Sequence, residues 1–102
     1  MPQLVVQEIR LSNPTPAEGE KVRVYAKIAN TGDNDANDFW AIFYWTPEIV
    51  YSPKQAEKYI KPEYEIYREY LEELKSGSVT EISFDWEAKE GVKSILVFAK
   101  TK

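Results

Sequence analysis

The sequence predicts a mainly β fold, an antiparallel β-sandwich, and three observations lead to this prediction. Several short runs alternate between apolar and polar residues, as strands with one buried face do. Clusters of Pro, Gly, Asn and Asp separate these runs, and such residues favour turns. Two further runs are apolar on both alternations, which is typical of strands covered on both faces. With 102 residues, we expect one domain over 1–102.

The first two strands are predicted from the N-terminal third of the chain. Residues 3–11 are rich in β-branched side chains and end before Pro14 and Pro16, which prevent continued pairing. Residues 21–28 alternate strictly, so that one face is apolar and the other polar. The expected inward residues are Val22, Val24, Ala26 and Ile28, and the outward ones are Arg23, Tyr25 and Lys27.

The middle of the chain is predicted to contain a loop, a strand and a helical insertion. Residues 30–38 favour a loop, and 39–45 form a doubly apolar strand. The β pattern breaks over about 47–77, where Pro53 and Pro62 are each expected to open a helix. A three-and-four spacing then predicts an amphipathic helix over 63–75, through Tyr64, Tyr67, Leu71 and Leu74.

Two more strands are expected near the C-terminus. Residues 79–87 alternate, with Ile82, Phe84 and Trp86 inward. Residues 92–99 are apolar on both alternations after their first few positions.

The order of these sequence segments resembles that of the CARDB domain, a seven-stranded immunoglobulin-like module named for cell-adhesion proteins. The resemblance lies in Leu4–Ile9, the Asn13-Pro14 turn, Gly19–Val22, Ile28–Asp33 and Phe84–Val92. The helical segment replaces a short hairpin of the family, and the family's usual last strand has no counterpart after Lys102. The resemblance implies a fold and an accessory, surface-associated role, with no catalytic residues to carry over.

Pattern and resemblance together predict which strands are neighbours. The strand at 21–28 should pair with 79–87, and the strand at 39–45 with 92–99. Arg23 and Lys27 would then face Glu81, Asp85 and Glu87 across one exposed sheet. On the outside of the other sheet, Trp40, Ile42 and Tyr44 would lie beside Leu96 and Phe98. We expect helix 63–75 to cover that apolar row, with Tyr67, Leu71 and Leu74 over Trp40, Ile42 and Phe98.

Composition argues against several classes of function. The chain has no Cys and no His, which excludes disulfides and thiolate metal sites and removes the commonest general base. A net charge of −4 argues against nucleic acid as a partner. No apolar run is long enough for membrane insertion, and the start has no export-signal pattern. The abundance of Lys, Glu, Tyr and Ile is thermophile-like.

Three groups of side chains are candidates for chemistry. The acidic loop 33–38 has calcium-like spacing at Asp33, Asp35 and Asn37, but Asp38 and Tyr44 stand where an EF-hand needs Gly and Glu, so a solvated turn is expected. Acidic residues for glycoside hydrolysis exist, at Glu63, Glu65, Glu69, Glu72 and Glu73, without an indicated cleft. A sugar-stacking platform is conceivable from Tyr51, Tyr59, Tyr64, Tyr67 and Tyr70, although packing is the commoner role of such rings.

We therefore expect a non-catalytic protein-interaction or structural module, with no catalytic, cofactor or metal residues. It would serve as an adhesion or spacer unit of a larger surface protein, and the resemblance places it at the cell surface or outside the cell. The alternative is a carbohydrate-binding module using exposed aromatic residues. The strand at 92–100 is expected to have an unpaired edge, through which the chain would self-associate or bind a protein partner.

Overall fold

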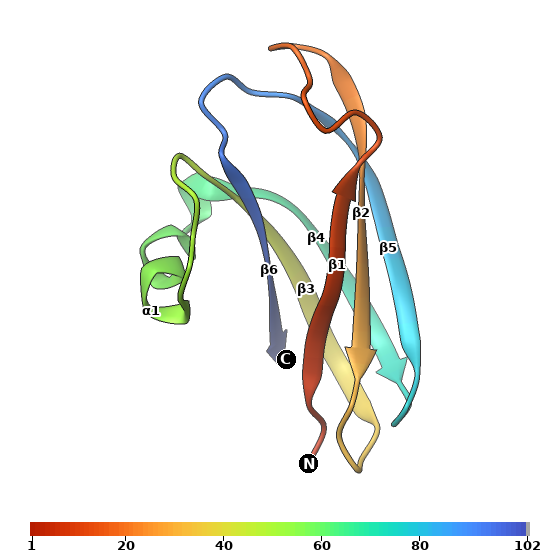
Figure 1. The fold of residues 1–102 in the computed structure, drawn as a ribbon. Coiled ribbons are helices and arrows are strands. Elements are labelled where there is room, and N and C mark those ends of the chain that lie inside the picture. The colour runs from red at the N-terminus through yellow and green to blue at the C-terminus, as the bar shows by residue number, and fades with distance from the viewer. Residues whose placement is uncertain (102) are drawn as a thin grey trace.

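The structure, a computed structural model, describes residues 1–101 and contains two antiparallel sheets packed face to face (Figure 1). One sheet has the strand order β1-β2-β5 and the other β4-β3-β6, each with three strands. The bounds are β1 Leu4–Leu11, β2 Lys21–Asn30, β3 Ala36–Thr46, β4 Glu65–Leu74, β5 Val79–Glu87 and β6 Ser94–Thr101. The predicted mainly β sandwich is confirmed, as are the pairings of β2 with β5 and of β3 with β6.

Between β3 and β4 the chain makes a short helical segment. It consists of α1 (Pro53–Ala56) and two 3-10 turns, η1 (Glu57–Tyr59) and η2 (Pro62–Tyr64). Ser52 caps α1 by accepting a hydrogen bond from the Gln55 amide at 3.1 Å, and Pro53 follows directly at the first helical position. The predicted helix opening at Pro53 is therefore confirmed. The segment lies on the side of the β4-β3-β6 sheet that faces away from the other sheet (Figure 1).

The helix predicted over 63–75 is wrong, because these residues form η2 and the edge strand β4. The expected lid therefore does not exist in that form. Leu71 pairs with Phe39 and Tyr67 with Phe43, beside β3 instead of over its outer face. Both side chains pack against the core between the sheets, and Leu74 is part of that core. Ser76 and Gly77 make the turn into β5, with Gly77 at a φ of 80°.

Two irregularities in the β3–β4 pairing explain why a strand has helical spacing. The register shifts between Phe43 and Tyr44, whose partners are Tyr67 and Glu65, so β4 carries an extra residue there. Near its other end β3 has Asp38 at a φ of 50°, and Ala36 and Leu74 beyond it both join the core. The register shift adds one residue to β4, whereas at Asp38 the register continues and the positive φ alone changes which residues face the core. The apolar spacing of three at both ends of β4 follows from this.

The core consists of the inward rows of both sheets. Its fully or nearly buried members include Val24, Ala26, Ile28, Phe39, Ala41, Phe43, Ile82 and Phe84. Phe84 meets Phe43 edge to face at 4.8 Å between ring centroids. The inward residues predicted on β2 and β5 are therefore correct.

A buried asparagine ties one end of the sandwich together. Asn30, 1% exposed, donates from Nδ2 to the carbonyls of Asn34 and Leu74, at 2.8 and 2.9 Å. Its Oδ1 accepts from the amides of Gly32 and Gln3. The neighbouring Gly32 has no room for a side chain, since a Cβ there would collide with the backbone of Met1–Gln3. The start of β1 is held against the β2–β3 loop in this way.

The outer faces of the two sheets differ as predicted. On β1-β2-β5, Arg23 forms an ion pair with Asp85 at 2.9 Å. Lys27 is opposite Glu81 in register but forms its ion pair with Glu8, at 3.7 Å. On β4-β3-β6 the outer row contains Ile42 and Tyr44, which are only 2% and 5% exposed.

Neighbouring strands and the helical segment surround this apolar outer row. Ile42 lies in register between Arg68 of β4 and Phe98 of β6. The Arg68 guanidinium is 5.4 Å from the centre of the Trp40 ring. Both 3-10 turns contact β3. Long side chains of the sheet and the segment 53–64 therefore surround the apolar outer row that a helix at 63–75 was expected to cover.

Candidate functional site

The sandwich has two long sides where the edges of its sheets meet, and one of them is closed. At the β4/β5 side, the Tyr67 ring stacks on Phe84 with centroids 4.3 Å apart and planes 14° from parallel. The Tyr67 hydroxyl donates to Glu69 at 2.8 Å. Aromatic packing therefore fills the space between the sheets on this side.

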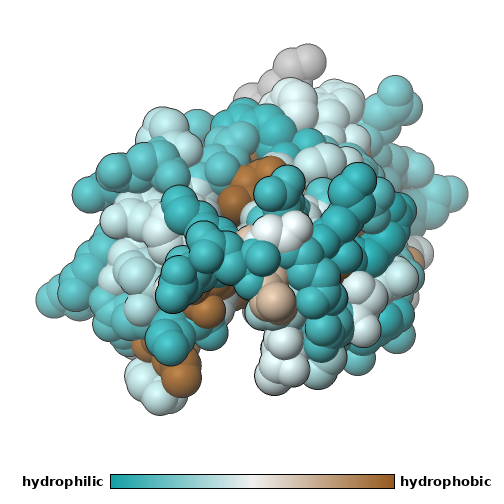
Figure 2. Space-filling model, turned by 90° about the horizontal axis from the view of Figure 1, so that it is seen from above, coloured by the Kyte–Doolittle hydropathy of each residue, from teal (hydrophilic) through white to brown (hydrophobic). Residues whose placement is uncertain are grey.

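The β1/β6 side is open and contains two cavities. The upper cavity, about 680 Å³, lies between Ile9 and Leu11 of β1 and the 88–95 segment, with Trp86 in its wall. The lower one, about 430 Å³, lies between Leu4 and Val6 of β1 and Val97–Ala99 of β6. Seen from above, a notch with hydrophobic surface beside it separates two lobes of the molecule (Figure 2). Apolar side chains of both sheets thus face a gap that this part of the chain leaves unfilled.

Strand β6 has an unpaired backbone edge on the open side. It pairs with β3 on one side, and no strand among residues 1–101 pairs with its other side. The first strand pairs only with β2, so it does not cross over to close this edge. Two exposed hydrophobic residues, Val6 and Phe98, line the lower cavity of this gap. The predicted open edge at 92–100 is therefore present in the described residues.

The other three edge strands carry features that discourage pairing with another chain. Strand β1 has a bulge at Gln7, between Val6 and Glu8. Strand β4 has its own bulge and five charged residues in Glu65–Leu74, and β5 has Glu81, Asp85 and Glu87. Within β6, Lys100 is the one charged residue, and the register with β3 is unbroken. Bulges and charges protect edges, so β6 is the least protected edge of the molecule.

Charged groups gather at the upper end of the gap. Glu18, Lys89, Glu90 and Lys93 all line the upper cavity. The Lys89 ammonium is 4.3 Å from the centre of the Trp45 ring, and the Lys93 amide donates to the Thr46 carbonyl at 2.8 Å. Among the described residues, no ionisable side chain lines the lower cavity. A ligand in the gap would therefore meet charge at one end and apolar surface at the other.

Tyrosines with perturbed pKa values lie away from the open side. The Tyr59 hydroxyl donates to Glu48, which raises the pKa of Tyr59 to about 12 and lowers the pKa of Glu48, and Gln55 donates to the same carboxylate at 2.7 Å. Hydrogen bonds to Glu69 and Asp38 raise the pKa values of Tyr67 and Tyr70, and burial raises that of Tyr44. The hydrogen bonds of these tyrosines involve the helical segment and β4. None of these tyrosines lines either cavity.

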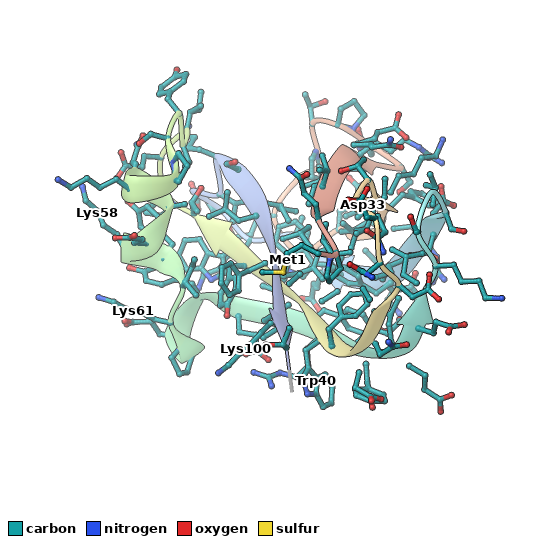
Figure 3. The ribbon with its side chains drawn as sticks, turned by 90° about the horizontal axis from the view of Figure 1, so that it is seen from below. Met1, Asp33, Trp40, Lys58, Lys61 and Lys100 are labelled. Atoms are coloured by element: carbon teal, nitrogen blue, oxygen red, sulfur yellow. The ribbon has the colours of Figure 1, made fainter. Side chains whose placement is uncertain are left out.

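The five tyrosines proposed for sugar stacking do not share one face. Tyr59 and Tyr64 meet edge to face at 5.2 Å, and Tyr64 also meets Trp45. Tyr67 is stacked in the interior, whereas Tyr51 is 82% exposed. Tyr70 meets Trp40 at 5.3 Å with planes 61° apart, on the outer side of the sheet where Figure 3 shows Trp40. Lys58 and Lys61 of the helical segment point away from the sandwich (Figure 3).

The acidic candidates are used as hydrogen-bond and ion-pair partners. Asp35 accepts from the Ser76 amide at 2.9 Å, and Asp38 accepts from the Tyr70 hydroxyl. Glu65 pairs with Arg68 at 2.7 Å, which lowers the pKa of Glu65. In the described part of the chain, no group of three or more acidic residues is arranged to hold a metal ion. None of its helices is long and apolar enough to span a membrane.

Comparison with known proteins agrees with this architecture. The family model named CARDB matches residues 1–99, almost the entire chain. No curated protein and no solved structure gives a significant match.

Proposed function

The chain belongs to the CARDB family of non-enzymatic, immunoglobulin-like modules of larger proteins, and we propose that it acts as a protein-interaction module at the β1/β6 side. In this proposal the module has no catalytic role. It binds an extended segment that adds a strand to β6 while side chains of that segment enter the gap between the sheets. As a unit of a larger surface protein, it would link or space neighbouring parts.

The observation that carries the proposal is the coincidence of an unprotected strand edge with two cavities, the lower mainly apolar and the upper partly charged. Backbone groups of β6 supply hydrogen bonds without regard to sequence, because every added residue presents the same donor and acceptor. Specificity would come from every second side chain of the added segment, because these side chains would point into the cavities beside Ile95 and Val97. An apolar segment fits the lower cavity best, because none of the described residues that line it is ionisable.

Hydrogen exchange on a dilute sample tests whether the edge is available. We expect alternate amides of β6 to exchange fast, since half of them point away from β3, while the amides of β3 are protected on both sides. The comparison with β3 is an internal control in the same spectrum. Uniform protection along Ser94–Thr101 in a dilute monomer would mean that the edge is closed, and the proposal would fail.

A carbohydrate-binding role is the alternative candidate, and it would use Trp40 and Tyr70 on the outer face. Their planes differ by 61° and Arg68 lies near the Trp40 ring, so they do not offer one flat platform for a sugar. We therefore expect tryptophan emission to remain unchanged when polysaccharides are titrated into the protein. A saturable change that a Trp40→Ala variant loses would favour the alternative.

A further inference from the structure

The geometry of β6 limits how two copies of this strand can pair. A two-fold axis perpendicular to the sheet makes two identical strands antiparallel and keeps the inner face of each strand on the inside. Residues directly opposite each other must then point to the same face, so their numbers differ by a multiple of two. The axis therefore passes through a residue. Val97 and Phe98 are the two positions that leave most of Ser94–Thr101 overlapped.

An axis at Val97 gives the better register. It places Leu96 opposite the partner's Phe98 on the outer face, and Ile95 opposite the partner's Ala99 on the inner face. Ser94 then faces the partner's Lys100, so no charged residue faces another. An axis at Phe98 would instead place Leu96 opposite the partner's Lys100. Apolar pairs directly across a sheet are favourable. In the Val97 register, each of the apolar residues 95–99 has an apolar residue of the partner opposite it.

Pairing in this register also covers the surface that is exposed on the open side. Phe98 is 42% exposed and lines the lower cavity together with Val6 and Val97. In the pair, each Phe98 gains Leu96 of the second copy as a neighbour, and the two open sides face each other. The bulge at Gln7 keeps β1 from forming an equally regular pair, so β6 provides the contact.

We infer that the strand added to β6 is β6 of a second copy of this chain, paired antiparallel about Val97. This inference rests on the proposed function, and it identifies the partner. The two β4-β3-β6 sheets then form one continuous six-stranded sheet. Among the described residues, Lys93 and Lys100 of each copy do not oppose this pairing, because residues an odd number of positions apart project from opposite faces of an extended chain.

Single introduced cysteines test the register, since the natural chain contains none. In a Val97→Cys variant the two thiols face each other, with Cα atoms about 4.5–5.5 Å apart as in any directly opposed pair, which is within disulfide range. In the matched Ser94→Cys control, the two introduced cysteines are six residues apart along the strand direction, or about 20 Å. We expect oxidation to convert most of the first variant, and little of the second, to a covalent dimer.

Sedimentation equilibrium over micromolar concentrations measures the association itself. Phe98→Lys changes two symmetry-related contacts, and we expect it to raise the dimer dissociation constant about tenfold or more. Val79→Lys is the control, because Val79 is 52% exposed on β5, away from the contact. We expect that control to change the constant less than about twofold.

The outcomes separate the inference from the proposal on which it rests. Dimerisation with Val97→Cys cross-linking supports both. A monomer whose alternate β6 amides exchange fast overturns self-pairing, while the open edge remains available to a different partner. A dimer that resists Phe98→Lys and does not cross-link through Val97→Cys overturns the β6 contact. A monomer with every β6 amide protected overturns the inference and the proposed function together.

Discussion

The two long sides of the sandwich are built from the same kinds of edge strand, yet one is sealed and the other is open. At the β4/β5 side, Tyr67 stacks on Phe84, and both strands carry many charges. At the β1/β6 side, two cavities separate the strands, and β6 is almost uncharged. Charges on the edge strands of the closed side and their near absence from β6 are what a protein needs if only one of its edges is to bind another strand.

The largest expected effect of this difference concerns the loss of a large side chain. Phe84→Ala should cost about 3–5 kcal/mol of unfolding free energy, since Phe84 is nearly buried between Phe43 and Tyr67. Ile9→Ala, in the wall of the upper cavity, should cost only about 1 kcal/mol, because its surroundings are already partly open. Urea unfolding of both variants in dilute solution measures the difference. Equal losses would show that the β1/β6 side is as well packed as the other.

The second expected effect comes from adding volume at two positions that face each other in register. Ala41 of β3 is fully buried, whereas its partner Ala99 of β6 lines the lower cavity. Ala41→Leu should cost about 1–3 kcal/mol through overpacking. Ala99→Leu should change the stability by less than about 0.5 kcal/mol, because the cavity has room for the extra methyl groups. A large loss in the second variant would mean that the cavity closes in solution.

The smallest expected effect is a dependence of the closed side on alkaline pH. Tyr67 donates to Glu69, and this bond together with burial raises the pKa of Tyr67. The stabilisation is fully present below the ordinary tyrosine pKa and is lost as the pH rises through the raised value. Stability of the natural chain should therefore fall more steeply above about pH 10 than that of Tyr67→Phe. Urea midpoints measured across that range test this, and Tyr51→Phe is the control for removing one exposed tyrosine.

Most of the fold could be predicted because alternation fixes both the strands and their faces. The strand at 79–87 was predicted with its observed bounds, and its pairing with β2 follows from the family order of strands. The error over 63–75 has a definite cause. The register shift at Phe43 and the positive φ of Asp38 change the spacing of the inward residues of β4 from two to three. The sequence shows only this spacing, which is also that of a helix, and not the irregularities that cause it.

The candidate site could be predicted only in part. The apolar, nearly uncharged run at 92–99 indicates a strand whose edge has little protection against pairing. The two cavities were missed, because they depend on the distance between β1 and β6, which belong to different sheets. The bulge at Gln7 was missed as well, although the consecutive polar residues Gln7 and Glu8 interrupt the alternation between Val6 and Ile9.

The network around Asn30 has a consequence for how fast the molecule unfolds. Its partners Gln3 and Leu74 lie 27 and 44 residues away along the chain, on the margins of β1 and β4. The hydrogen bonds to Gln3 and Leu74 can form only after these distant segments have assembled, whereas those to Gly32 and Asn34 are local. Contacts that form after the transition state slow unfolding while leaving the folding rate almost unchanged. We therefore expect the two long-range hydrogen bonds of Asn30 to slow unfolding more than they speed folding.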